Sequence, residues 1–260
     1  MAIGLIGGSG LAQGLERIIQ GVERHELDWP QCTIPFYTGT MHGTDVVIVP
    51  RHGDSSTGKP QLTPAKLTER KGYHAIAWLF REQGVSEAYG FSAIGSIDTD
   101  LPIANEGVFA IPSTYGMGPG GVRHSFGSDA DIPHTNMRTP FDTRLRMRLF
   151  QAVCDAGYQA VLNGIYIYTG GDAFETPEEV IASGIMYPGP KPRLLGMTTV
   201  PELQLLAQLG IPYATLCSNV NYAEGVTDMV VSHEQTLKVM DVAGKMVVRI
   251  AEKLLEQRAQ

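Results

Sequence analysis

The stretch Ala-Ile-Gly-Leu-Ile-Gly-Gly-Ser-Gly, residues 2–10, decides much of the fold. Its apolar run Ala2–Ile6 predicts a buried strand, and Gly7 to Gly10 break that strand with a turn leading into a helix from about Leu11. Such a turn exposes backbone N–H groups that favour a phosphate. A tight strand–helix turn explains the glycines equally well. A nicotinamide-binding turn is a rival, but the third position of its G-x-G-x-x-G pattern falls on Gln13.

Further strands and helices alternate along the rest of the chain. Short apolar or β-branched runs predict strands at Asp45–Pro50, Val85–Ile94, Gly107–Pro112, Val161–Thr169, Leu194–Thr198 and Ile211–Ser218. Helical periodicity predicts helices at about Pro64–Gln83, Phe141–Ala156, Glu175–Ser183 and His233–Gln257. The segment Ser113–Asn136 is expected to be a loop. This order predicts an α/β fold with a mainly parallel or mixed sheet that helices flank on both faces.

The composition narrows the class of protein. The 260 residues are 43% hydrophobic and 18% charged, and no linker divides them, which favours one domain over residues 1–260. A formal charge of −7 argues against nucleic acid as a partner. No run of about 20 apolar residues is present to span a membrane, and no secretory signal pattern occurs. Cys32, Cys154 and Cys217 lack metal-site spacing, so we expect no metal and a cytoplasmic location.

Several candidate polar groups fall at the carboxyl ends of the predicted strands. Because ligands of α/β sheets bind beyond the carboxyl ends of strands, we expect these residues to form one site. They are Ser9, Arg51-His52, Ser92-Ala93, Gly170–Glu175, Met197-Thr198 and Asn219–Asn221. An Arg-His pair suits a phosphate, although as an isolated pair it is more often a surface feature. The segment around Ser92 lacks the G-x-S-x-G spacing of a serine hydrolase.

The run Gly196-Met197-Thr198-Thr199-Val200-Pro201-Glu202 resembles a family signature. It is similar to the G-M-[ST]-x-x-P-E run of the trimeric purine-nucleoside phosphorylase and methylthioadenosine (methylthioinosine) phosphorylase family. The likeness extends in order over most of the chain, through Ile6–Leu11, Arg51-His52-Gly53, Ser92–Ser96, His134–Met137 with Pro140-Phe141, and Gly171–Thr176. The resemblance implies a nucleoside-phosphorylase-like fold, a homotrimer or dimer of trimers, and inorganic phosphate as co-substrate without any cofactor.

The resemblance also implies roles for individual residues. The phosphate ligands would be Ser9, Arg51, His52, Ser92, Ala93 through its N–H, and Thr198. The nucleoside would meet Met197 at the sugar, Phe174 on the purine face, His233 near the 5′ group and, from a neighbouring subunit, His134. Glu175 and Asn221 would act on the purine edge. Phe174 is alternatively a core residue, His134 a surface residue and His233 a helix-start residue.

Asn221 bears on which purine is cleaved. Relatives that act on 6-aminopurines typically have Asp at this position, and those that act on 6-oxopurines have Asn. An amide donates to O6 and accepts from a protonated N7. The expected reaction is therefore phosphorolysis of inosine, guanosine or S-methyl-5′-thioinosine, giving the free purine and ribose 1-phosphate or its 5-methylthio analogue. Open alternatives are S-methyl-5′-thioadenosine phosphorylase and, more remotely, an NAD-dependent reductase or a non-catalytic nucleoside-binding protein.

Three features depart from the family pattern. The base-binding loop has Gly171-Asp172 where the family has Gly-Pro, which adds a carboxylate. The helix after Arg51-His52 carries Gly72-Tyr73-His74 instead of an Asn-Tyr pair. An insertion covers about Asp54–Thr63. These departures affect the expected substrate more than the expected fold.

Overall fold

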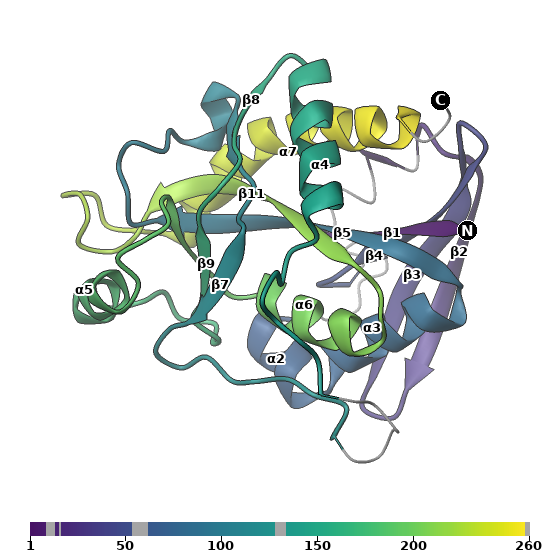
Figure 1. The fold of residues 1–260 in the computed structure, drawn as a ribbon, viewed down its shortest axis with the longest axis horizontal. Helices are drawn as coiled ribbons and strands as arrows, with labels where there is room; N and C mark the ends of the chain where they lie inside the picture. Colours follow the sequence, from purple (N-terminus) through teal and green to yellow (C-terminus); the bar gives the residue numbers. More distant parts are fainter. Residues whose placement is uncertain (9–13, 16, 54–61, 128–133, 258–260) are drawn as a thin grey trace.

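A computed structural model describes residues 1–8, 14–15, 17–53, 62–127 and 134–257. Over these residues the chain forms one mixed sheet of 11 strands with helices packed around it (Figure 1). This arrangement confirms the predicted α/β class. The helix expected from about Leu11 and most of the Asp54–Thr63 insertion lie outside the described residues.

The strands follow one another along most of the chain. Their bounds are β1 Ala2–Gly7, β2 Gln20–Trp29, β3 Cys32–Met41, β4 Thr44–Pro50, β5 Val85–Ser96, β6 Val108–Ala110, β7 Thr114–Met117, β8 Gln159–Val161, β9 Ile165–Tyr168, β10 Arg193–Gly196 and β11 Tyr213–Tyr222. The main path through the sheet is β2-β3-β4-β1-β5-β10-β9-β7, and β11, β6 and β8 branch from β5. β1 runs parallel to β4 and β5, whereas β10 runs antiparallel to β5.

β5 is the centre of the sheet because its 12 residues contact three neighbouring strands. Its first half pairs with β1, nearly its whole length pairs with β11, and its last residues pair with β10. Since β10 runs in the opposite direction, the chain leaving β10 comes back to the middle of β5. This is how residues after β10 and residues of β5 reach the same place.

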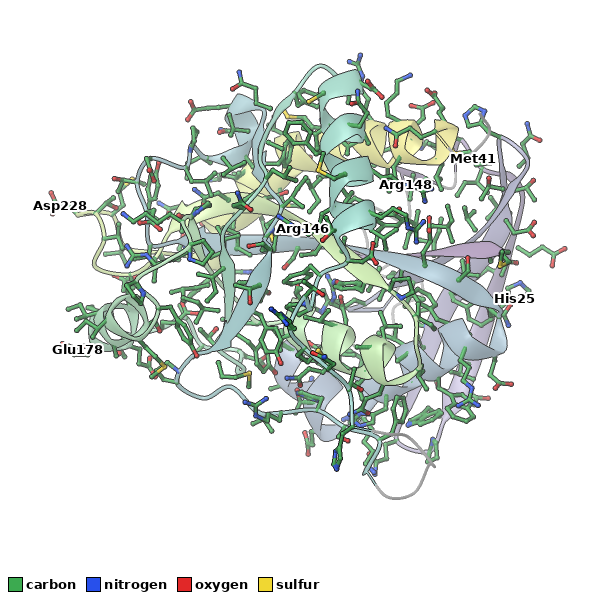
Figure 2. All side chains as sticks on the ribbon, in the orientation of Figure 1. His25, Met41, Arg146, Arg148, Glu178 and Asp228 are labelled. Carbon is green, nitrogen blue, oxygen red and sulfur yellow. The ribbon has the colours of Figure 1, made fainter. Side chains whose placement is uncertain are left out.

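Helices cover both faces of the sheet. One face packs on α2 Pro64–Glu69, α3 Gly72–Glu82 and α6 Thr199–Gln208, and the other on α4 Thr143–Asp155 and α7 His233–Glu256 (Figure 1). α5 Pro177–Met186 lies at one end of the molecule, and a short 3₁₀ helix spans Ala104–Glu106. Figure 2 shows Glu178 of α5 and Asp228 at this end, with His25 of β2 at the opposite end. Among the described residues, no helix combines the length and apolarity needed to cross a bilayer.

Several predicted elements differ from those observed. The single helix expected over Pro64–Gln83 is two helices, because Lys71 adopts a left-handed backbone with φ 52°. The single strand expected over Val161–Thr169 is β8 and β9, interrupted by Gly164 at φ 124°. The hairpin of β2 and β3 was not predicted. β7 occupies part of the segment that was expected to be a loop.

Candidate active site

A cavity of about 460 Å³ opens where β4, β5, β10 and β11 bring their polar residues together. Its wall also includes the loop before α5 and the first turns of α7. Nine of the predicted site residues line it: Arg51, His52, Ala93, Phe174, Glu175, Met197, Thr198, Asn221 and His233. They come from segments spread over more than 180 residues of sequence, so their meeting in one cavity is a property of the fold.

The other three predicted residues are not among the described residues that line the cavity. Ser92 does not line the cavity, but its Oγ lies 3.2 Å from Oγ1 of the cavity residue Thr198. His134 is exposed and is not part of the cavity wall of its own chain. Ser9 lies outside the described residues.

Arg51 enters the cavity as half of a buried ion pair. Its Nε donates to Glu202 Oε1 at 2.5 Å and its Nη2 to Oε2 at 3.0 Å, while Nη1 donates to the carbonyl of Phe91 at 3.0 Å. Arg51 is 3% exposed and Glu202 1%. Burial works to lower the pKa of Arg51, but the Glu202 carboxylate outweighs it and raises that pKa. The guanidinium is therefore charged, and its neighbour compensates that charge.

His52 is a neutral imidazole with a fixed tautomer. Its Nδ1 lies 2.7 Å from the carbonyl of Leu62. A carbonyl only accepts, so Nδ1 carries the proton and Nε2 is left as an acceptor. Burial and then the charge of Arg51 lower the pKa of His52 to about 4, against the opposite effects of the Leu62 carbonyl and of Asp172. To donate to an anion through Nε2, His52 has to take up a proton.

Tyr166 organises the hydroxyl groups between Ser92 and Thr198. Its Oη accepts from the backbone N–H of Thr198 at 3.3 Å and of Thr199 at 3.4 Å, and lies 3.4 Å from Ser92 Oγ. Gly196 makes this approach possible, since a Cβ there would lie 2.2 Å from the Tyr166 hydroxyl. Ser92 and Thr198 are 5% and 7% exposed, so their hydroxyl groups are held in a nearly dry environment.

The other end of the cavity is more open. Phe174 is 39% exposed, and Glu175 is partly exposed in the loop just before α5. Glu175 was expected within a helix, but Thr176 caps α5 through a capping box with Glu179 and leaves Glu175 outside. Asn221 is partly exposed near the end of β11 and donates from Nδ2 to the carbonyl of Tyr222 at 2.9 Å. Asn221 also lines the cavity.

The first turns of α7 form the third side of the cavity. Ser232 caps the helix by accepting from the N–H of Gln235. His233 thus begins α7 at the cavity, and Thr236, Leu237 and Met240 follow on the same side. The apolar side chains of Leu237 and Met240 thus line the cavity together with His233.

Sequence reasoning assigned no role to Glu202, Tyr166 or Asp172. Glu202 was visible as the last residue of the Gly196–Glu202 run, and a buried acidic residue in such a run signals a partner. Tyr166 lay in an alternating strand and carried no separate signal. Among the described residues, no group of three or more His, Cys, Asp or Glu side chains gathers as metal ligands do.

Comparisons with known proteins show the family of the chain. The model of the phosphorylase superfamily matches residues 2–256. The chain is 30% identical over 251 residues to a probable 6-oxopurine nucleoside phosphorylase of Moorella thermoacetica, covering 94% of this chain and 88% of that one. It is 27% identical to a probable S-methyl-5′-thioinosine phosphorylase of Methanopyrus kandleri, with 98% and 91% covered.

The fold is also similar to that of a phosphorylase of known structure. A mutant of the adenosine/methylthioadenosine phosphorylase of Schistosoma mansoni, in complex with adenine, matches with a TM-score of 0.83 at 20% identity. The match covers 99% of this chain and 92% of that one. The architecture is therefore that of a nucleoside phosphorylase. The chain belongs to the phosphorylase superfamily.

Proposed function

We propose that this protein cleaves the N-glycosidic bond of 6-oxopurine nucleosides with inorganic phosphate. The observation that carries the proposal is one cavity lined by two chemically distinct sets of residues. Arg51, His52 and Thr198 offer groups suited to an anion, and Phe174, Glu175 and Asn221 offer groups suited to a purine. We assign the first set to a phosphate end of the cavity and the second to a purine end. The sugar would lie between them, against Met197. Family membership favours this reaction over that of a nicotinamide-dependent reductase.

The proposed reaction needs no covalent enzyme intermediate. A phosphate oxygen forms a bond to the anomeric carbon while the bond from that carbon to the purine nitrogen breaks. The electron pair leaves with the purine, which takes up a proton. Catalysis then consists of holding the phosphate in line and stabilising the charge on the sugar and on the leaving purine.

The phosphate end supplies mainly hydrogen-bond donors. Among the described residues, Glu202 and Phe91 take three of the five guanidinium N–H groups of Arg51, so this part of the chain leaves two for a ligand. The Thr198 hydroxyl, the Ala93 N–H and a protonated His52 would complete the set. The phosphate dianion itself favours protonation of His52, since an opposite charge close by raises the pKa of an imidazole.

The purine end favours a 6-oxo group. The Asn221 amide donates to O6 and accepts from a protonated N7, and Glu175 accepts from the N1–H that a 6-oxopurine carries. A 6-aminopurine would leave these groups mismatched. Relatives named for 6-oxopurine nucleosides and for S-methyl-5′-thioinosine support the same choice.

A 5′-methylthio nucleoside is the second candidate substrate. Leu237 and Met240 line the cavity beside His233, and apolar side chains suit a thioether better than a hydroxyl. His233 supports the opposite choice, because it offers a hydrogen bond to a 5′-hydroxyl. A relative of Thermococcus kodakarensis is named S-methyl-5′-thioadenosine phosphorylase, so a 6-amino substrate is also tested.

Side-by-side assays test the proposal. Release of free purine is measured with inosine, S-methyl-5′-thioinosine and S-methyl-5′-thioadenosine, each with and without phosphate. We expect phosphate-dependent release that is faster for both 6-oxo substrates. Faster release from the 6-amino substrate would overturn the base assignment. No phosphate-dependent release from any substrate would overturn the reaction itself.

We further infer a homotrimer whose sites are completed by neighbouring chains. His134 is exposed, away from the cavity of its own chain. On α5, next to the open purine end, Ile181 is 62% exposed and Ile185 77%. Apolar side chains so exposed are typical of surfaces that another protein covers.

Subunit mixing tests this assembly. His134→Ala and Glu175→Ala chains, each impaired alone, are mixed under conditions that allow subunit exchange. If His134 serves a neighbour's site, about a quarter of the sites in an equal mixture regain both residues. Activity that stays at the mean of the two variants after verified exchange would show that each site uses one chain.

We also infer a cytoplasmic location. Cys32, Cys154 and Cys217 are free thiols in the structure. Free thiols persist in a reducing compartment. Fractionation of the source cells, with an antibody to the protein, tests this inference.

A further inference from the structure

Asp172 connects two walls of the cavity that are distant in sequence. It belongs to the loop that leads to Phe174 and Glu175, and it lines the cavity. Its Oδ1 accepts a hydrogen bond of 3.0 Å from the backbone N–H of Ala65, a residue 107 positions earlier. Ala65 lies in the first turn of α2. The bond therefore ties the loop at the purine end to the beginning of α2.

The segment on the far side of this bond belongs to the phosphate end. Leu62, Thr63 and Pro64 precede Ala65 and line the same cavity. The carbonyl of Leu62 accepts from His52 Nδ1 at 2.7 Å. A displacement of the start of α2 would thus move the partner that fixes the His52 ring. Asp172 is thus hydrogen-bonded to Ala65, which follows by three positions the Leu62 carbonyl that fixes the His52 ring.

We propose that Asp172 is a positioning residue that couples the binding of the purine to the binding of phosphate. This inference rests on the proposed phosphorolysis. Purine contact with Phe174 and Glu175 orders the loop, and the Asp172–Ala65 hydrogen bond transmits that order to the segment that holds His52. Phosphate acts in the reverse direction through the same bond, because coupling between two binding sites is reciprocal.

The carboxylate charge of Asp172 has a separate effect from its hydrogen bond. The charge raises the pKa of His52, whereas burial and Arg51 lower it. Since Nδ1 already donates to Leu62, His52 needs a second proton to donate to phosphate. Asp172 favours that proton and so favours phosphate binding.

Two substitutions separate these effects. Asp172→Asn keeps an amide oxygen that can accept from the Ala65 N–H but removes the charge. Asp172→Ala removes both. Asp228→Ala is the matched control, because Asp228 is an exposed carboxylate that does not line the cavity.

The experiment measures hypoxanthine binding by calorimetry with and without saturating inorganic phosphate. We expect phosphate to tighten hypoxanthine binding to the wild-type protein. Asp172→Ala should reduce this coupling by roughly 2- to 10-fold, the range that one intramolecular hydrogen bond contributes. Asp172→Asn and Asp228→Ala should retain it. No coupling in the wild type, an unchanged coupling in Asp172→Ala, or an equal loss in Asp172→Asn would overturn the proposal.

Steady-state kinetics then measures the effect of the Asp172 charge separately from that of its hydrogen bond. Asp172→Asn should raise the phosphate KM by up to about 5-fold, as loss of one partly exposed charge does, with the nucleoside KM unchanged. An unchanged phosphate KM would overturn the charge effect. The wild-type assay keeps the two proposals apart, since a wild-type protein that fails to phosphorolyse any purine nucleoside refutes the function and not only the coupling.

Discussion

The two ends of the cavity are built in opposite ways. At the phosphate end, the side chains of Arg51, Ser92 and Thr198 are buried and hydrogen-bonded within the protein. At the purine end, Phe174 is 39% exposed and Glu175 lies on a loop. The first end is therefore held in place by contacts within the protein, whereas the second is more exposed.

This difference suits the ligands proposed for the two ends. A phosphate ion is small and strongly hydrated, so it is held best by donors already fixed in place. A purine is a large flat ring that stacks on an exposed aromatic face and tolerates adjustment of a loop. Mutations should therefore affect folding at the phosphate end and substrate choice at the purine end.

The largest expected effect is on stability, at the phosphate end. Glu202→Ala would leave the Arg51 guanidinium buried without its carboxylate, because both residues are nearly inaccessible. Breaking a buried pair by removing one partner costs about 3–5 kcal/mol. Urea denaturation should show a loss of this size in the free energy of unfolding.

Glu175→Ala is the matched variant at the purine end. Its carboxylate is partly exposed, so the free energy of unfolding should change by no more than about 0.5 kcal/mol. Equal losses in the two variants would show that the ends do not differ in how they support the fold.

The second largest effect is on substrate choice, at the purine end. Asn221→Asp replaces an amide that donates to O6 with a carboxylate that repels it. One such donor in the transition state contributes about 10²–10³ in rate. The kcat/KM for S-methyl-5′-thioinosine should fall relative to that for S-methyl-5′-thioadenosine, which shares its 5′ group. The phosphate KM serves as the control and should stay near the wild-type value, and an unchanged ratio between the two substrates would show that Asn221 does not read the base.

The sequence predicted the strands that carry the site because those strands are buried and apolar. β1, β4, β5 and β11 all appear close to their expected positions. β2 was missed because both of its faces are largely exposed at the sheet edge, so its residues show no apolar alternation. The break at Lys71 was missed since a left-handed lysine leaves no mark in helical periodicity.

The cavity was predicted better than its internal contacts. Residues at strand ends meet wherever the strands are parallel, so the grouping of Arg51, Ala93 and Asn221 follows from topology. The pairing of Arg51 with Glu202 joins residues 151 positions apart. The Gly196–Glu202 run marks this carboxylate as notable, but nothing in the sequence identifies Arg51 as its partner. Arg51, predicted as a phosphate ligand, therefore carries a charge that Glu202 compensates.

The smallest expected effect is on acid stability, and it separates a buried histidine from an exposed one. Burial and then the neighbouring His74 lower the pKa of His124 to about 4, and the pKa of His52 lies at a similar value. An unfolded histidine has a pKa of about 6.5. Between these values the unfolded chain binds more protons than the folded protein, so stability is lost as the pH falls from about 6.5 to about 4.

His124 tests this expected loss of stability because it is buried, packs on Tyr73 and Tyr168, and does not line the cavity. The free energy of unfolding is measured at pH 6.5 and at pH 4 for the wild type, for His124→Phe and for His233→Gln. Each buried histidine should contribute about 1–3 kcal/mol to the difference between the two pH values, so the difference should shrink by that amount in His124→Phe. Comparing each variant with itself cancels any general loss of stability from the substitution. His233 is exposed at the start of α7, and His233→Gln should lose as much stability as the wild type. If His124→Phe loses as much stability as the wild type between pH 6.5 and pH 4, the low pKa of His124 does not contribute to the acid sensitivity of the protein.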